Sequence, residues 1–152
     1  MSVVELSDEE NVAILAETFT DSLADLGDRT RQLAVLKRLY ELLDSKTPQY
    51  FIYEIVTGCE ELQVIRAGDD LRIFCRLVVG IPEGNKHYNV LFVFYTDPHR
   101  YDQGTLQRLD AAARERLETL GALNELDSVE QYLDEQNAFT AADIKQRIDR
   151  LQ

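Results

Sequence analysis

Residues 71–79 read Leu-Arg-Ile-Phe-Cys-Arg-Leu-Val-Val, and residues 88–95 read Tyr-Asn-Val-Leu-Phe-Val-Phe-Tyr. In the first stretch, leucine, isoleucine and cysteine alternate with a second set that includes Arg72 and Arg76, which is the period of a strand with one apolar face. The second stretch is apolar at almost every position, so it predicts a central strand covered on both faces. Residues 80–86 contain two glycines, a proline and an asparagine, which favours an antiparallel hairpin with a longer loop.

Two earlier stretches extend the predicted sheet. Residues 62–66 form a short run typical of a strand. The turn residues 67–70 connect it to the strand over residues 71–79. Residues 50–56 are rich in aromatic and β-branched residues and end at Thr57-Gly58. The sequence therefore predicts an antiparallel meander of about four strands.

Two helices are expected before this sheet. Residues 7–10, Ser-Asp-Glu-Glu, have the form of a capping box, and an apolar stripe at helical spacing follows as far as Gly27. Asp28 is placed to cap a second helix whose leucine stripe ends at Thr47-Pro48. We expect an antiparallel helical hairpin, preceded by residues 2–6 as either an edge strand or a disordered start.

Three helices are expected after the sheet. The first is capped by Asp102 or Thr105 and ends at Gly121, and two short ones start at Ser128 and Thr140. The predicted fold class is α+β: a helical hairpin packed on an antiparallel β-meander, followed by a C-terminal helix and two short tail helices. Residues 1–121 would form the α+β domain and residues 122–152 a helical extension.

The charge balance is acidic, with 28 Asp and Glu residues against 16 Lys and Arg residues and a net charge of −12. Such a field repels nucleic-acid phosphates and anionic lipid, so binding to either is not the default. Arginine greatly outnumbers lysine, and the surplus of carboxylates resembles cytosolic proteins of salt-loving organisms. The alternative is an ordinary acidic protein.

The first residues, the apolar runs and the cysteines indicate where the protein works and whether it holds a metal. The first residues do not resemble a signal peptide, and no apolar run approaches the ~20 residues that span a bilayer, so we expect a cytoplasmic protein. Cys59 and Cys75 have no CxxC spacing and read as free thiols. Acidic residues in the turns, such as Asp97 and Asp102, are a weak metal pattern. We therefore expect no metal and no cofactor.

The order of two helices, a meander and a helix resembles the RelE/ParE/HigB toxin superfamily. The resemblance is one of pattern over about residues 1–120, and it is carried by residues 61–66, 70–76, 88–94 and 101–120. It implies a toxin-like, ribosome-dependent or free endoribonuclease that cuts mRNA and is inhibited by an antitoxin-like partner protein.

The resemblance also implies roles for single residues. Arg72 and Arg76 fall on the strand that offers arginine to the scissile phosphate, and Arg100 falls in the loop that carries the basic cluster of the family. His99 or Tyr101 would transfer protons. This sequence departs from the family because residues 95–100 carry one fixed positive charge where active members have a run of lysine and arginine.

Simpler alternatives accompany these assignments. Arg72 and Arg76 share a strand face with Phe74 and could grip a phosphate while the ring stacks on a base, or they could simply pair with nearby acids. The tail helices could bury their apolar positions on the body, over the open sheet face, or against a second copy in a homodimer. The second functional hypothesis is a non-catalytic interaction or regulatory module with the same fold.

Overall fold

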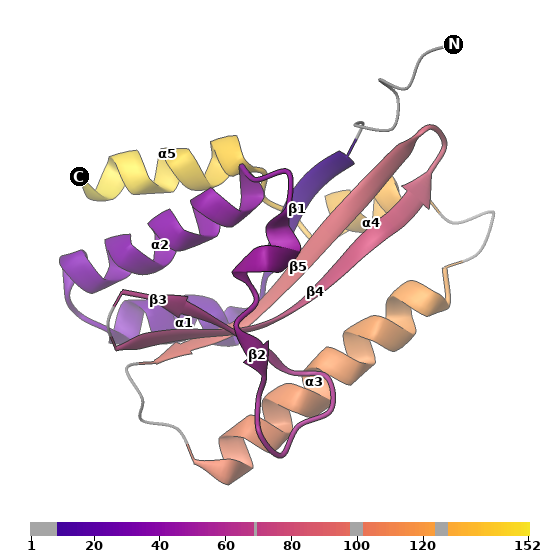
Figure 1. The fold of residues 1–152 in the computed structure, drawn as a ribbon. Helices are drawn as coiled ribbons and strands as arrows, with labels where there is room; N and C mark the ends of the chain where they lie inside the picture. The colour runs from indigo at the N-terminus through magenta and orange to yellow at the C-terminus, as the bar shows by residue number, and fades with distance from the viewer. Residues whose placement is uncertain (1–8, 69, 98–101, 124–127) are drawn as a thin grey trace.

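The computed structural model describes residues 9–68, 70–97, 102–123 and 128–152, and within them one five-stranded sheet lies between two groups of helices (Figure 1). The strand order is β1-β5-β4-β3-β2. Along the chain the elements are β1 (Glu9–Leu15), α1 (Glu17–Asp25), α2 (Arg29–Leu43), a 3-10 helix (Pro48–Phe51), β2 (Glu54–Ile55), β3 (Gln63–Ala67), β4 (Leu71–Glu83), β5 (Lys86–Asp97), α3 (Gln103–Gly121), α4 (Val129–Glu135) and α5 (Ala141–Leu151).

The predicted meander is confirmed, because β2, β3, β4 and β5 follow one another as antiparallel neighbours. The expected long loop between the last two strands is wrong. β4 continues to Glu83, which pairs with Lys86, and only Gly84 and Asn85 make the turn. Gly84 has a φ of 62°, the positive value that the first central residue of a tight hairpin turn requires. The glycine signal was correct, but it marks a two-residue turn.

The N-terminal prediction needs a correction, because residues 9–15 are a strand and not the start of a helix. β1 runs parallel to β5 along its whole length. Val12 and Ile14 face one core while Ala13 faces the other, so the segment alternates with the period of a strand buried on both faces. Pairing with the edge of the central strand outweighs the helical spacing of Val12, Leu15, Phe19 and Leu23. The first helix begins only at Glu17.

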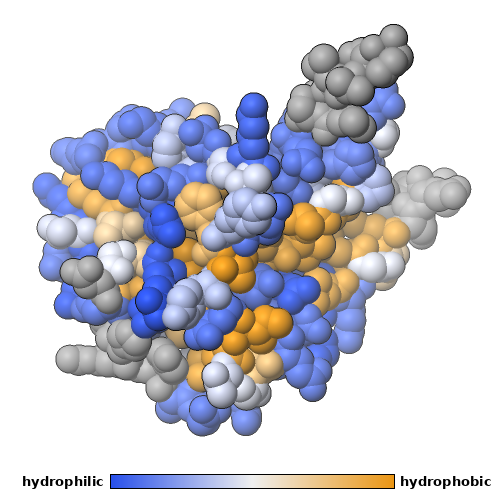
Figure 2. All heavy atoms as spheres, viewed as in Figure 1, coloured by the Kyte–Doolittle hydropathy of each residue, from blue (hydrophilic) through white to orange (hydrophobic). Residues whose placement is uncertain are grey.

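The expected strand over residues 50–56 is also mostly wrong. Pro48 lacks an amide hydrogen and opens a 3-10 turn, which leaves only Glu54–Ile55 in the sheet. This short edge leaves large side chains in solvent: Tyr50 is 80% exposed, Tyr53 52% and Ile55 49%. Figure 2 shows patches of hydrophobic surface among hydrophilic residues on the face of the molecule that carries β2.

The sheet separates two apolar cores. On one face, Ile73, Cys75 and Leu77 pack beneath α1, α2 and α5; on the other, Phe74 and Val78 pack beneath α3 and α4. The alternation is therefore confirmed from Leu71 to Val78, whereas Val79, which the pattern placed on the apolar face, is 53% exposed. Figure 1 shows α2 and α5 side by side on one side of the sheet and α3 crossing the other.

The predicted caps of the later helices are confirmed. Asp28, Asp102, Ser128 and Thr140 each accept a hydrogen bond from a backbone amide of the helix that they precede, and Thr140 and Asp143 complete a capping box. The tail helices bury their apolar residues on the body of the chain, α4 beneath the sheet and α5 on α2. A homodimer through these helices stays a prediction.

In the described part of the chain, helices cover the middle of both faces of the sheet, so the arginine-bearing face is not the free surface that the sequence suggested. Among the described residues, no helix has the length and apolar character needed to cross a membrane.

Candidate functional site

Two arginines of neighbouring strands lie opposite each other at the end of the sheet from which β5 leads towards α3. Arg66 of β3 is in register with Arg72 of β4, and Arg72 is in register with Asp97 of β5 on its other side. Residues so paired lie on one face with Cβ atoms about 5 Å apart, and like charges in this position repel each other. Neither guanidinium forms an ion pair within the described ranges. A bound anion would remove this repulsion.

Aromatic rings accompany these arginines. The guanidinium carbon of Arg66 lies 3.7 Å from the centre of the Tyr53 ring, and that of Arg38 lies 4.6 Å from the centre of the Phe51 ring. Arg38 also donates from Nε to the carbonyl oxygen of Arg66 at 3.0 Å. Arginine beside an accessible aromatic ring is a surface suited to phosphates and unstacked bases. We call Arg66, Arg72 and Tyr53 the Arg66–Arg72 site.

Tyr95 and Asp97 border this site on β5. The hydroxyl of Tyr95 donates to Oδ2 of Asp97 at 3.4 Å. Burial raises the pKa of Tyr95, and the negative charge of Asp97 raises it further. The phenol therefore stays protonated at neutral pH, where it can donate a proton but not accept one. A hollow of about 310 Å³ adjoins it, lined by Ser22, Asp25, Leu26, Arg31, Tyr95, Thr96 and Asp97.

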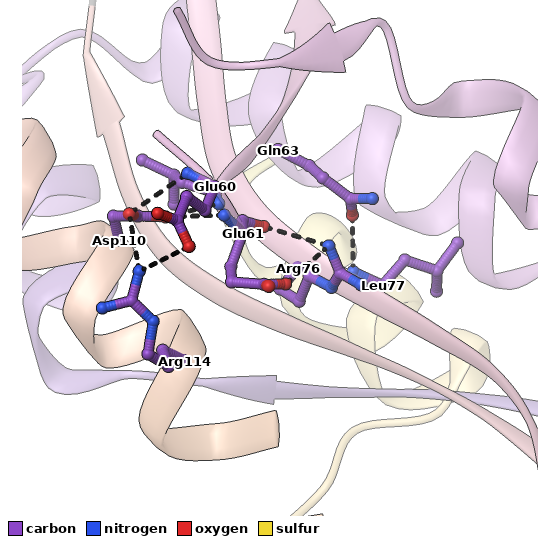
Figure 3. A network of polar contacts seen from close by, with 8 residues as sticks. Glu60, Glu61, Gln63, Arg76, Leu77, Asp110 and Arg114 are labelled. Atoms are coloured by element: carbon purple, nitrogen blue, oxygen red, sulfur yellow. Dashed lines mark hydrogen bonds and ion pairs between the residues drawn. The ribbon is translucent and has the colours of Figure 1, made fainter. Parts of the chain in front are cut away.

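Arg76 has a different environment on the same strand. Its Nη1 lies 3.2 Å from Oε2 of Glu61 and donates to the carbonyl oxygen of Glu61 at 3.3 Å (Figure 3). Its side chain is only 22% exposed. Its buried Nε has no hydrogen-bond partner within the described part of the chain. Arg76 therefore holds the segment that leads into β3, and its charge is already compensated by Glu61.

Asp110 of α3 holds the same segment before β3 by accepting hydrogen bonds from its backbone. Its two carboxylate oxygens accept hydrogen bonds from the backbone amides of Glu60, Glu61 and Leu62 at 3.2, 2.8 and 2.9 Å. Arg114 lies 3.7 Å from this carboxylate (Figure 3). Burial alone would raise the pKa of Asp110, but the three amides and Arg114 outweigh it and the pKa is lowered. This contact is structural, and it sets the position of β3 and so of Arg66.

The sequence-predicted site residues are distributed as follows. Arg72 and Arg76 do share a face of β4, but they have different partners. His99, Arg100 and Tyr101 lie outside the described residues. The proposed stacking role of Phe74 is wrong, because this ring is 1% exposed and packs under α3.

Sequence reasoning missed Arg66 and Tyr53. The position of Arg66 could have been found from the turn over residues 67–70, since closing it tightly brings residues 66 and 72 opposite each other. The stack on Tyr53 could not, because it depends on the 3-10 turn that replaces the expected strand.

The cysteines and carboxylates form no further centre in the part of the chain that the structure describes. Cys75 is buried, and burial raises the pKa of its thiol. No group of three histidine, cysteine or acidic side chains is arranged to hold a metal ion among the described residues.

No protein-family model, curated protein or solved structure matches the chain.

Proposed function

We propose that this chain is a toxin-like endoribonuclease of the RelE/ParE type, which binds the phosphodiester backbone of RNA at the Arg66–Arg72 site. One observation carries the proposal. Two arginines that form no ion pair among the described residues lie opposite each other, beside a stacked tyrosine, at the end of β5 that leads into the connection carrying His99, Arg100 and Tyr101.

The chemistry assigns a role to each group. Arg66 and Arg72 offset the charge that develops on the phosphate oxygens, and such electrostatic stabilisation usually contributes most to the rate of phosphoryl transfer. Tyr53 stacks on a base next to the cleaved bond. The 2′-hydroxyl of the RNA attacks the phosphorus and the 5′-oxygen leaves. His99 or Tyr101 takes the proton of the 2′-hydroxyl or supplies the proton of the leaving 5′-oxygen, and water carries the other proton.

The acidic surface fits this proposal when the protein works at high ionic strength. At 1 M salt the Debye length is ~3 Å, so the net charge of −12 is screened while contacts at the Arg66–Arg72 site persist. The composition of the chain, with its excess of arginine over lysine, supports such an environment.

Induced expression tests the proposal. The wild-type chain is expected to arrest growth and to fragment mRNA, and Arg72→Ala to relieve both because it removes one of the two phosphate contacts. A purified assay on a synthetic mRNA should show a loss of about a hundredfold in cleavage rate. Arg150→Ala, an exposed arginine of α5, is the matched control and should cleave as the wild type does.

The proposal would be contradicted if cells that express the wild-type chain grew normally with intact mRNA, and if the purified chain also left mRNA intact when ribosomes were added. Equal cleavage by Arg72→Ala and Arg150→Ala would contradict it too, because the reaction would then not use the Arg66–Arg72 site.

A non-catalytic interaction module with the same fold is the second candidate. It is favoured by the state of Arg76, whose charge is compensated by Glu61, and by Asp97, whose buried carboxylate faces Arg72. RNA binding by the wild-type chain without cleavage would select this alternative.

A further inference from the structure

The opposite edge of the sheet has backbone groups without partners in the described ranges. β1 is the outermost strand there (Figure 1). Ala13 turns its amide and carbonyl outward, and both bond to Phe139 as an isolated antiparallel bridge, at 2.8 and 2.7 Å. Because backbone direction alternates along a strand paired without interruption, Glu9 and Asn11 also point their amides and carbonyls outward. These groups have no partner within the described part of the chain.

Hollows lie against this edge on both faces of the sheet. On the side of α4, a hollow of about 730 Å³ includes Val12 and Leu133. On the side of α2, a hollow of about 270 Å³ includes Asn11 and Leu43. An added strand would point its side chains alternately to the two faces, so one set would enter the larger hollow and the other set the smaller.

The larger hollow has an acidic rim over an apolar floor. Glu10, Glu130 and Asp134 line it, and no described lysine or arginine does. Lys86 compensates Glu10 at 3.2 Å, and Glu130 accepts a hydrogen bond from the neutral hydroxyl of Tyr88. Long basic side chains match this arrangement, since their aliphatic stems can lie on the floor while their charged ends meet the rim. The smaller hollow on the other face is lined by residues of both charges, among them Asp44 and Lys46, so it does not favour basic side chains in the same way.

We propose that the outer edge of β1 binds an extended basic polypeptide segment as an added antiparallel strand. Main-chain hydrogen bonds to Glu9 and Asn11 extend the ladder that Phe139 begins at Ala13. Alternate arginine or lysine side chains occupy the acidic hollow, and small residues between them occupy the hollow beside α2. This interface lies at the edge of the sheet farthest from β2 and does not depend on the proposed ribonuclease activity.

The test measures binding of a labelled synthetic peptide to the full chain, at the lowest salt concentration at which the chain stays folded. In this peptide arginine and threonine alternate. Two peptides serve as controls: one alternates glutamate and threonine, and the other alternates arginine and proline, which keeps the charge but lacks half of the amides. We expect the first peptide to bind and both controls to bind at least about tenfold more weakly. On binding, amide exchange should slow at Glu9 and Asn11.

Charge-removing variants locate the contact. The double variant Glu130→Gln, Asp134→Asn should weaken binding of the arginine–threonine peptide about tenfold. A matched double variant on the exposed side of α3, Glu115→Gln with Glu118→Gln, should leave it unchanged. Equal loss in both would show general attraction to an acidic protein and overturn the proposal. Absence of binding, equal binding of the arginine–proline peptide, or unchanged exchange at Glu9 and Asn11 would overturn it too.

Discussion

Arg72 and Arg76 lie on the same strand and the same face, four residues apart, yet the two regions around them differ. At Arg76, Glu61 supplies a carboxylate and a carbonyl oxygen, and Asp110 fixes the backbone that holds Glu61. Arg72 has another arginine, Arg66, opposite it on β3, and although Asp97 of β5 is in register on its other side, Arg72 forms no ion pair within the described ranges. The strand period gives both side chains the same direction, but the segments that pack around them decide whether the charge is used within the fold or remains for a ligand.

Removing Asp110 tests the region around Arg76, which we call the anchored region, and should have the largest effect on stability. Asp110→Ala leaves the amides of Glu60, Glu61 and Leu62 without their acceptor, one of them buried, which we expect to cost about 3 kcal/mol of unfolding free energy. Urea unfolding followed by circular dichroism measures this loss. Asp110→Asn keeps one acceptor oxygen and should lose less, whereas equal losses in the two variants would mean that this remaining oxygen does not replace the carboxylate as an acceptor for the amides.

Alanine at each of the two arginines compares the regions directly. Arg76→Ala removes the partner of a half-buried Glu61 and should lower the unfolding free energy by about 1 kcal/mol. Arg72→Ala should change it by less than about 0.5 kcal/mol, since its guanidinium forms no ion pair within the described ranges and it repels Arg66. Thermal unfolding of both variants in one buffer gives the comparison. Equal destabilisation would remove the distinction between the two regions.

The sequence predicts the fold where local pattern and tertiary pairing agree. The alternation in residues 71–78 indicated the correct faces for β4, and Asp28, Ser128 and Thr140 marked helix starts that the structure confirms. It failed at β1, because a parallel partner distant in sequence decides that segment.

The candidate site was predictable in part for the same reason. Arg72 is visible in the strand pattern, whereas its pairing with Arg66 depends on register. The compensation of Arg76 depends on the loop before β3, which Asp110 positions from a helix almost fifty residues later. No periodic pattern in the sequence predicts that contact.

The pH dependence of stability sharpens the account of the anchored region. The pKa of Asp110 is lowered from its ordinary 3.8, so its carboxylate favours the folded state above that pH. The difference in unfolding free energy between wild type and Asp110→Asn should stay constant from neutral pH down to about that value. It should then fall as the pH drops through the lower folded-state pKa. Taking the difference cancels the other carboxylates, and a difference that grew in acid would contradict the assignment.

The smallest effect concerns the salt dependence of RNA affinity. Each phosphate that a protein neutralises on a single strand adds about 0.7 to the slope of log affinity against log salt concentration. Arg72→Ala should therefore lower this slope by about 0.7 for a 2′-O-methyl oligonucleotide, which binds but cannot be cut. Arg76→Ala should leave the slope as it is, because Glu61 already neutralises that guanidinium. Fluorescence anisotropy over a series of salt concentrations measures both. A lower slope in Arg76→Ala would show that RNA displaces Glu61, and the two regions would then form one binding surface.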